Sequence, residues 1–319
     1  MKKGESQEMK YSSLGRTGLH VSQLALGTAA FGLENYGIQE PGEQGRLSED
    51  QAIGLVRAAV DKGVNFFDTA RGYGESEAVL GRGLSDFPSC IVATKVGIAE
   101  AARGHSALTR AVMDSVETSL KALRRDVLDI VQIHNATQDV LEREEILDVL
   151  EHAREVGKLK FVGVSVYGEP AALAAVRSGR IDVLQIALNL LDQRMLTMVL
   201  PEARKNNVGI IARSAFLKGA LTDRARLLPD GLRGLSEASD RMREALGETW
   251  DSLPRAALRF CLSTPGVHSV LVGLRSLPEL AAAIASEEAG PLDNAVVRRT
   301  DLLKLNDDQL LNPSHWPTV

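Results

Sequence analysis

Four side chains with acid, base or proton-donor chemistry end or closely follow short apolar runs of the sequence. Asp68 closes the run NFFD, and Tyr73 comes five residues later on a glycine-flanked turn. Lys95 lies within IVATKV, and His134 ends the run DIVQIH. Each has an ordinary structural explanation, because lysines are usually solvated and short polar residues often cap turns. Only the four residues together predict a role in proton transfer.

Together the four groups form the parts of a proton donor for a carbonyl oxygen. A free tyrosine phenol titrates near pH ~10, which is too high for efficient proton transfer at neutrality. A buried Lys95 ammonium, hydrogen-bonded to the Tyr73 phenol, is expected to lower that pKa, and Asp68 is expected to keep the lysine charged. His134 is suited to donate a hydrogen bond to a substrate carbonyl. This predicts protonation of an alkoxide while hydride arrives from elsewhere, without a metal site.

Eight strand-like runs alternate with amphipathic helical patterns and must position these groups. Several runs, such as IVATKV, are apolar without alternation, as expected for strands buried on both faces. Ser48 and Gln51 form a capping-box pattern at the start of the first helical segment, which ends at Gly63. The eight runs are Leu24–Gly27, Asn65–Asp68, Ile91–Lys95, Leu128–His134, Phe161–Ser165, Val183–Ile186, Gly209–Ala212 and Ser269–Val272.

Alternating strands and helices predict a parallel sheet, and eight such units predict a closed (β/α)8 TIM barrel. The alternative is a doubly wound sheet, but residues 27–32 lack the G-x-G-x-x-G spacing that such a sheet needs. Two short runs around residues 16–18 predict an N-terminal β-hairpin that caps the bottom of the barrel. The connections 29–47 and 214–240 are too long for plain turns, so we expect long loops on the C-terminal face.

We expect a single domain over residues 1–319. Its parts are a hairpin over about 11–22, a barrel over about 23–290 and a C-terminal tail over about 291–319. The tail is short, which leaves the expected substrate pocket open unless Trp316 folds back over it.

Composition narrows the class of protein further. The chain has 37 Lys and Arg against 42 Asp and Glu, a formal net charge of −5, and no Lys/Arg-dense segment, which argues against nucleic-acid binding. Both cysteines, Cys90 and Cys261, lie in apolar runs, which is typical of buried thiols in a reducing compartment. No secretory signal or membrane-length apolar segment is recognisable. We therefore expect a cytoplasmic protein without a membrane partner.

The chain resembles the aldo-keto reductases over about residues 11–286, because motifs similar to theirs follow in the family order. The matching stretches are Phe66–Glu77, Ala93–Lys95, Asp129–His134, Gly163–Ser165, Gln185–Asn189, Ile211–Gly219 and Val272–Ser276. The resemblance implies a (β/α)8 barrel that binds NADP(H) in extended form without a Rossmann motif. It assigns Tyr73 as general acid/base, Lys95 and Asp68 as residues that tune it, and His134 as the donor that orients the carbonyl.

The resemblance also implies a track of cofactor contacts along the strand ends. Ser165 and Gln185 match positions that hydrogen-bond the nicotinamide carboxamide, although Val166 replaces an asparagine that often follows the serine. Arg213 stands where many members stack an aromatic ring on the nicotinamide, and a guanidinium plane can also stack. The other expected cofactor residues are Gly27, Thr28, Asp68 and Gly273, with Ser214, Leu217, Lys218 and Gly219 on the pyrophosphate loop.

Two residues near the end of the track bear on the choice of cofactor. Arg275 matches the residue that grips the 2′-phosphate of NADP(H), a role that its fork geometry suits, and its alternative is an exposed loop arginine. Glu279 stands where a glutamine often contacts the adenine, and a carboxylate near a phosphate is repulsive. We expect NADP(H) as the cofactor, with NAD(H) as the alternative.

The first functional hypothesis is an NADP(H)-dependent oxidoreductase that reduces an aldehyde, ketone or sugar carbonyl, or runs the reverse oxidation. Its partner would be a small-molecule carbonyl or alcohol, and the oligomeric state is left open. The alternatives are a nicotinamide-binding regulatory subunit with little turnover, an NAD-preferring sugar dehydrogenase and a non-redox barrel such as a phosphosugar isomerase. The candidate substrate-pocket residues, for which ordinary loop packing is an equal alternative, are Phe31, Tyr36, Ile98, Tyr167 and Phe216.

Overall fold

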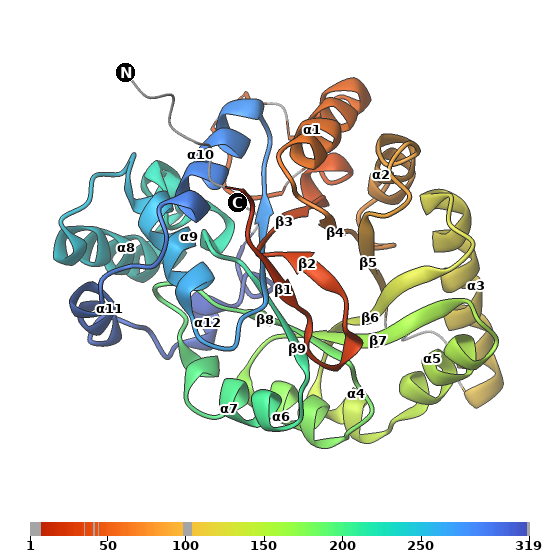
Figure 1. The fold of residues 1–319 in the computed structure, drawn as a ribbon. Coiled ribbons are helices and arrows are strands. Elements are labelled where there is room, and N and C mark those ends of the chain that lie inside the picture. Colours follow the sequence, from red (N-terminus) through yellow and green to blue (C-terminus); the bar gives the residue numbers. More distant parts are fainter. Residues whose placement is uncertain (1–7, 35, 41, 44, 98–103, 318–319) are drawn as a thin grey trace.

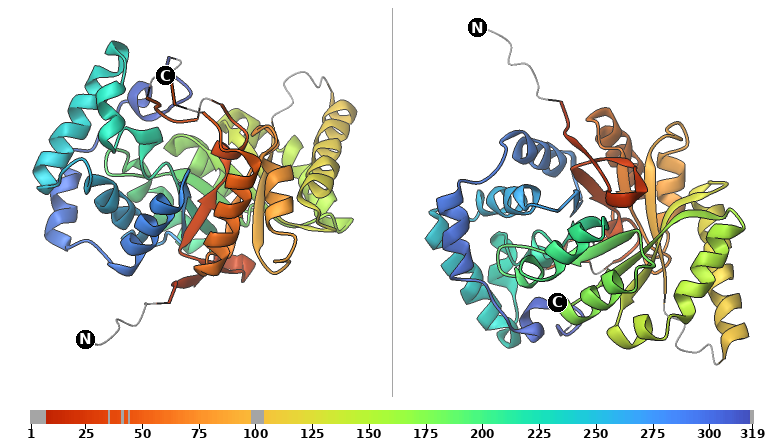
Figure 2. Two further views of the ribbon diagram at one scale, coloured as in Figure 1. Left: turned by 90° about the horizontal axis from the view of Figure 1, so that it is seen from above. Right: turned by 60° about the horizontal axis from the view of Figure 1, so that its bottom comes forward.

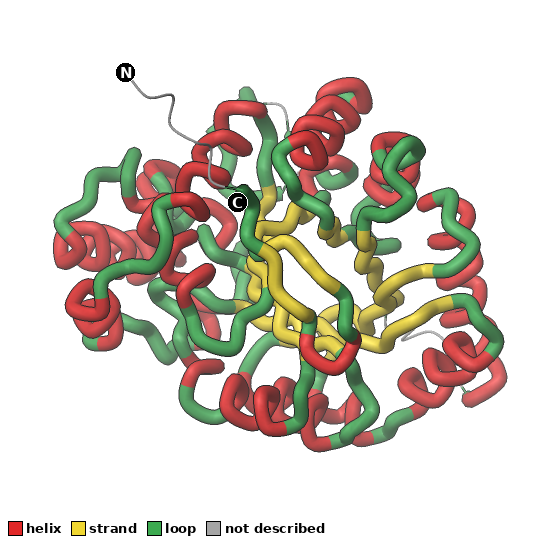
Figure 3. Tube along the Cα trace, viewed as in Figure 1, coloured by secondary structure: helices red, strands yellow, loops and turns green. Residues whose placement is uncertain are grey.

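A computed structural model describes residues 8–34, 36–40, 42–43, 45–97 and 104–317. Within these residues, eight parallel strands close into a barrel in chain order, with β10 paired to β3. The strands lie at the centre of the molecule, and helices form a ring around them (Figures 1 and 3). The barrel strands are β3 (Leu24–Gly27), β4 (Phe66–Asp68), β5 (Ile91–Val96), β6 (Leu128–Ala136), β7 (Leu159–Val166), β8 (Val183–Ala187), β9 (Gly209–Arg213) and β10 (Ser269–Gly273).

The predicted (β/α)8 barrel is confirmed, and all eight predicted runs form strands. The strand β7 is three residues longer than its predicted run, and β6 continues two residues past His134 to Ala136. The register with β7 shifts between Ile133 and Ala136, and Asn135 there has a left-handed φ of 52°. This irregularity bends the strand directly after His134, as bulges near active sites commonly do.

The helices cover the outside of the barrel. The predicted capping box opens α1, because Ser48 Oγ accepts the Gln51 N–H at 3.3 Å while Gln51 Oε1 accepts the Ser48 N–H at 3.0 Å. The helices are α1 (Glu49–Asp61), α2 (Ser76–Gly83), α3 (His105–Leu123), α4 (Gln138–Glu142), α5 (Glu145–Glu155), α6 (Glu169–Arg177), α7 (Val199–Lys205), α8 (Arg233–Leu246), α9 (Leu253–Ser263), α10 (Leu277–Glu288), α11 (Asn294–Asp301) and α12 (Asp308–Leu311).

A β-hairpin closes the N-terminal end of the barrel, as predicted. Strands β1 (Tyr11–Ser13) and β2 (His20–Ser22) pair antiparallel and lie across that end of the barrel (Figure 1; Figure 2, left). Leu14 and Val21 are fully buried against the inward-facing strand residues. Those partners are Ala25, Phe66, Ile91, Ala93, Ile130, Val183, Ile211 and Leu271.

The long connections lie at the opposite end, because they follow the carboxyl ends of parallel strands. The loop after β3 begins with a short 3-10 helix (Ala29–Phe31) and runs to α1, and the loop after β9 holds three further 3-10 turns before α8. The C-terminal tail contacts the loop after β8, where the Leu305 N–H donates to Leu191 O at 2.8 Å. Trp316 is buried and donates its indole N–H to Leu310 O at 3.1 Å, so it is anchored within the tail.

Both cysteines are free and buried. Cys261 Sγ donates to Leu188 O at 3.2 Å, and burial raises the pKa of its thiol far above the usual range. In the described part of the chain, no helix combines the length and apolarity needed to span a bilayer.

Candidate active site

The carboxyl ends of β4, β5 and β6 bring the expected catalytic side chains together. Asp68 is the last residue of β4 and pairs in register with Ala93 on β5. Two residues further along β5, Lys95 pairs with Gln132 on β6. The apolar runs of the sequence thus form neighbouring strands that deliver an acid, a base and an amide to one level of the barrel.

Lys95 is the buried cation of the site. Its Nζ forms an ion pair with Asp68 Oδ1 and donates to Thr69 O at 2.9 Å, and the whole residue is only 1% exposed. Burial lowers the pKa of the Lys95 ammonium, and the Asp68 carboxylate acts in the opposite direction. The Asp68 carboxylate therefore favours the charged form of the lysine.

The second oxygen of Asp68 is held by two amides. Gln132 Nε2 donates to Asp68 Oδ2 at 3.0 Å, and Gln185 Nε2 donates to the same atom at 2.8 Å. Sequence reasoning missed Gln132, although a glutamine inside the apolar run DIVQI was a visible signal. A glycine on the next strand makes room for it, because a Cβ on Gly163 would lie 2.9 Å from Gln132 Cγ. Gln185, which was expected at the nicotinamide, orients the aspartate in this structure.

Tyr73 lies beside Lys95 and His134, but its environment differs from the prediction. Lys95 Nζ is 5.2 Å from the centre of the Tyr73 ring, and its described donor contacts go to Asp68 and Thr69 rather than to the phenol. Burial, and then the Asp68 charge, raise the pKa of Tyr73 above its ordinary value. The expected lowering was wrong, because burial disfavours the phenolate and the Asp68 charge raises the pKa of Tyr73 further. Tyr73 is consequently a neutral phenol at neutral pH.

His134 packs edge-on against Tyr73, with ring centres 5.5 Å apart and an angle of 82° between the planes. Burial lowers the pKa of His134 to about 3, and the nearby charges of Lys95 and Arg213 contribute in the same direction. The imidazole is therefore neutral at physiological pH. The backbone of Gly72 lies against it, since a Cβ there would be 3.9 Å from Nδ1.

Two loops cross tightly beneath Tyr73. A Cβ on Gly32 would lie 1.7 Å from Tyr73 O, and a Cβ on Gly74, which has a left-handed φ of 54°, would lie 2.7 Å from Gly32 O. The buried Thr28 hydroxyl adds a further link, because it bonds Asp68 O at 3.0 Å and Ser76 Oγ at 2.7 Å. Thr28, expected as a cofactor contact, thus fixes the loop that carries Tyr73.

Arg213 and Tyr167 meet at the ends of β9 and β7. The guanidinium carbon lies 3.9 Å from the centre of the Tyr167 ring, and Arg213 Nη2 donates to Val166 O at 3.0 Å. Arg213 Nε is buried and has no hydrogen-bond partner among the described residues. Val166, which replaces the family's asparagine, thus holds the arginine through its backbone carbonyl. The stack joins an expected cofactor residue to an expected substrate residue.

The other candidate pocket residues fall into different environments. Tyr36 lies over the end of β10, because a Cβ on Gly273 would be 3.3 Å from its Cε1. Burial, followed by the fields of Tyr73 and Tyr167, raises the pKa of Tyr36. Phe31 is only 2% exposed and belongs to the hydrophobic core, in line with the packing alternative. Phe216 is half-buried, and Ile98 lies outside the described residues.

The expected pyrophosphate loop is a tight turn with unusual backbone angles. Ser214, Leu217 and Lys218 have left-handed φ values of 63°, 44° and 54°, and Gly219 follows at 107°. Such turns form concavities that bind anions. Lys218 O accepts the Ile38 N–H at 2.9 Å, which ties this turn to the loop after β3.

Arg275 and Glu279 flank the start of α10. Glu279 Oε2 accepts the Arg275 N–H at 2.7 Å, and the Glu279 N–H donates to Ser276 Oγ at 3.3 Å. This is a helix-capping arrangement, so the Glu279 carboxylate already has a structural partner. The Arg275 guanidinium points instead to the loop after β3, where it contacts Glu43 Oε1 at 3.3 Å and Gly45 O at 2.9 Å.

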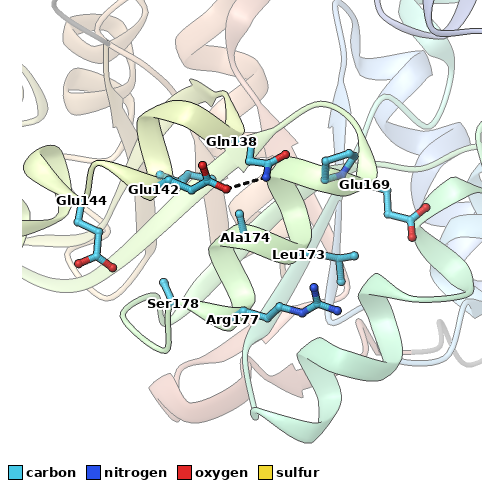
Figure 4. Close-up of a pocket in the computed structure, with 10 residues that line it drawn as sticks. Gln138, Glu142, Glu144, Glu169, Leu173, Ala174, Arg177 and Ser178 are labelled. Atoms are coloured by element: carbon cyan, nitrogen blue, oxygen red, sulfur yellow. Dashed lines mark hydrogen bonds between the residues drawn. The ribbon is translucent and has the colours of Figure 1, made fainter.

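A separate groove of about 690 Å³ lies between α4 and α6, on the ring of helices (Figure 4). None of its lining residues belongs to the strand-end cluster. Gln138 Nε2 donates to Glu142 Oε1 at 2.6 Å on one wall, and Arg177 and Leu173 lie on the other. Within the described residues, no group of three or more His, Cys, Asp or Glu is arranged to hold a metal ion.

The chain is similar to known proteins over nearly its whole length. A model of the Aldo/keto reductase family matches residues 23–304. L-galactose dehydrogenase of Arabidopsis thaliana is 29% identical over 300 residues, which are 88% of each chain. Aldo-keto reductase YhdN of Bacillus subtilis is 27% identical over 300 residues, covering 86% of this chain and 87% of that protein.

Among solved structures, aldo-keto reductase AKR11C1 from Bacillus halodurans in its holo form shares the fold. The TM-score is 0.76 at 24% identity, and the match covers 97% of this chain and 99% of that one. The family match begins just before β3 and ends after α11, so it includes every barrel strand. The chain belongs to the aldo/keto reductase family, whose members are oxidoreductases that use NAD(P)H cofactors.

Proposed function

We propose that the protein is an NADP(H)-dependent carbonyl reductase or alcohol dehydrogenase in which Tyr73 is the general acid/base. The observation that supports this most directly is the cluster at the ends of β4 to β6. There a neutral phenol and a neutral imidazole lie side by side above a buried Lys95–Asp68 pair. Such a pair of uncharged donors suits a carbonyl oxygen that becomes negative during reaction.

The strand ends offer a surface that fits an extended dinucleotide. Gly27 and Gly273 pair in register at the ends of β3 and β10, where Tyr36 lies over Gly273. At the end of β9, Arg213 Nε is a buried donor that has no hydrogen-bond partner among the described residues. Ser165 Oγ and Gln185 Oε1 are 3.5 Å apart, a weak mutual contact that leaves both suited to hold the carboxamide.

The residues of the chain handle the proton, while the bound nicotinamide cofactor supplies the hydride for the carbonyl carbon. His134 donates its N–H to the carbonyl oxygen and fixes its position beside Tyr73. The Tyr73 phenol then gives its proton to that oxygen as negative charge develops. The Lys95 ammonium, 5.2 Å from the ring centre, stabilises the phenolate that remains until solvent returns a proton.

The substrate class includes sugars as well as simple aldehydes and ketones. L-galactose dehydrogenase is named for a sugar that it acts on, and it covers 88% of this chain at 29% identity. A stacked Arg213–Tyr167 pair beside the cluster is a surface that binds polar, planar or ring-shaped molecules. L-galactose oxidation therefore belongs in the first substrate screen, beside reduction of aldehydes and ketones.

The decisive experiment replaces Tyr73 with phenylalanine. Tyr73→Phe is expected to reduce carbonyl reduction by about 10³-fold or more, because the proton donor is lost, while NADPH binding stays near normal. Steady-state rates and titration of NADPH fluorescence measure the two effects. Tyr11→Phe is the matched control, since Tyr11 lies on the hairpin at the other end of the barrel.

Retained turnover in Tyr73→Phe would rule out the proposed proton donor. Binding of NADPH without oxidation of the bound cofactor by any aldehyde, ketone or sugar, followed by stopped flow, would instead identify the regulatory-subunit alternative. Absence of binding by both NADPH and NADH would exclude the whole redox assignment.

A further inference from the structure

Three loops that are far apart in the sequence meet at one carboxylate near the start of α10. Glu43, in the loop after β3, receives both arms of the Arg224 guanidinium, at 2.6 Å on Oε2 and 2.9 Å on Oε1. Arg275, at the end of β10, approaches the same Oε1 to 3.3 Å. Glu43 is thus shared by two arginines that come from the loops after β9 and β10.

The three side chains are largely shielded from solvent. The exposed fractions are 28% for Arg224, 25% for Glu43 and 18% for Arg275. The hydrogen bonds from Arg224 hold the pKa of Glu43 well below its usual range, at about 2. The carboxylate is therefore ionised throughout the physiological pH range.

Two guanidinium groups that converge on one point form a site for an anion. Without a negative partner between them, Arg224 and Arg275 would repel one another in a region that water only partly screens. A phosphate monoester has three acceptor oxygens and about two negative charges, and like a carboxylate it accepts paired hydrogen bonds from arginine forks. Glu43 fills a position that a phosphate would also satisfy.

The site formed by Glu43, Arg224 and Arg275 lies along the proposed cofactor track. Two bonds hold the loop after β3 at Ile38: its N–H donates to Lys218 O, and its carbonyl oxygen accepts from Arg224 Nη1 at 2.7 Å. The loop therefore runs from Tyr36, over the end of β10, past the expected pyrophosphate turn and on to Arg275. A dinucleotide bound between these points would bring its adenosine ribose to the Glu43 cluster.

On the basis of the proposed function, we infer that Glu43 reduces the preference for NADP(H) over NAD(H) and that Arg224 joins Arg275 as a ligand of the 2′-phosphate. The phosphate of NADP(H) must displace the Glu43 carboxylate from both arginines. The 2′-hydroxyl of NAD(H) can instead donate a hydrogen bond to Glu43 as it stands, which is how acidic residues recognise this ribose elsewhere. Glu43 therefore weakens NADP(H) binding relative to NAD(H).

Cofactor binding, rather than turnover, tests the inference. Glu43→Gln keeps the shape of the side chain and removes its charge, so the dissociation constant of NADPH should fall about fivefold to tenfold. Adenosine 2′,5′-bisphosphate should gain affinity in parallel, whereas NADH and 5′-AMP should gain none and should weaken by up to about fivefold, because a neutral amide accepts the 2′-hydroxyl bond less strongly than a carboxylate. Isothermal titration with the four probes measures all of these values.

The chain offers a matched control in the same loop. Glu40 forms an ion pair with Arg226 at a more exposed position, so Glu40→Gln removes an equal charge without touching Arg275. It should leave all four constants within about twofold of the parent values. Arg224→Met should weaken NADPH and adenosine 2′,5′-bisphosphate and spare NADH.

Equal changes for NADPH and NADH in Glu43→Gln, or no change in either, would overturn the inference while leaving the proposed function intact. A gain in NADPH affinity that Glu40→Gln reproduces would also overturn it, because the effect would then come from overall charge. Failure of the parent protein to bind either dinucleotide would refute the proposed function and this inference together.

Discussion

The two ends of the barrel are closed by different kinds of side chain. At the N-terminal end, Leu14 and Val21 fill the interior with apolar contacts from the hairpin. At the C-terminal end, the interior is closed by the Lys95–Asp68 ion pair and by Gln132, which holds the second carboxylate oxygen. Apolar packing tolerates small shifts, whereas a buried charge needs every partner in place. Variants at the first end should therefore change stability, and variants at the second should change rates.

After the loss of Tyr73, the largest expected effect on rate comes from His134 at the C-terminal end. His134→Gln removes the imidazole that orients the carbonyl, so kcat/KM for carbonyl reduction should fall about 10²-fold to 10³-fold. The free energy of unfolding should fall by no more than about 1 kcal/mol, because glutamine keeps a polar side chain at this partly buried position. Steady-state kinetics and urea denaturation measure the two quantities, and a large loss of stability would contradict the division between the ends.

The matching change at the N-terminal end is Leu14→Ala. Removing this fully buried side chain should lower the free energy of unfolding by about 2–5 kcal/mol. The kcat of the folded enzyme at 25 °C should not change, because the cavity lies at the end of the barrel opposite the site. Leu19→Ala, at a half-buried position beside Leu14, should cost less in the same urea titration. A fall in kcat would show that the two ends are coupled.

An intermediate effect is expected from Gln132, which lies inside the barrel. Gln132→Leu removes one of the two amides that hold Asp68 Oδ2, so kcat should fall roughly tenfold as the Lys95–Asp68 pair loses its orientation. The free energy of unfolding should fall by only about 1 kcal/mol. The dissociation constant of NADPH is the internal control, since a change there would mean that Gln132 acts on cofactor binding instead.

The smallest expected effect is that of pH on reduction. His134, with its pKa at about 3, stays neutral above about pH 5, and Tyr73, with its raised pKa, stays protonated well above neutrality. The value of kcat/KM should vary by less than about twofold between pH 5 and 9 and fall only in more alkaline solution, as the phenol loses its proton. A decline as the pH rises through 7 would show that the pKa of Tyr73 is lowered, and a decline as the pH falls through 7 would show that His134 keeps an ordinary pKa.

The barrel and the positions of its four central side chains could be predicted because local sequence determines them. Unbroken apolar runs mark strands buried on both faces, and parallel strands bring Asp68, Lys95 and His134 to one end without knowledge of any loop. The position of Tyr73 could be predicted as well, because its turn is only five residues from Asp68. The direction of the pKa shift of Tyr73 could not be predicted from the sequence, because burial depends on how distant loops cover the ring.

Contacts between loops could not be predicted from the sequence. Arg224 and Glu43 are 181 residues apart and belong to connections without a periodic pattern. Gln132 was visible as a polar residue in an apolar strand. Its contact with Asp68 could be recognised only from the structure, in which Gly163 makes room for it and Gln185 binds the same carboxylate oxygen. The location of Phe31 could not be predicted either, because the loop after β3 places its side chain in the hydrophobic core and not in a pocket.

The crossing of Gly32 beneath the Tyr73 carbonyl has a consequence for how the protein can be altered. Residues before the crossing share a backbone contact with the loop that carries Tyr73, so an insertion there would displace the phenol. Beyond the crossing the loop runs outward and returns to it, because the Leu47 N–H donates to Ala30 O at 3.4 Å, so changes in length between Gly32 and Leu47 should move the phenol least. Evolution and protein engineering can thus retune recognition of the cofactor and of the substrate independently of proton transfer, and Gly32 marks the boundary.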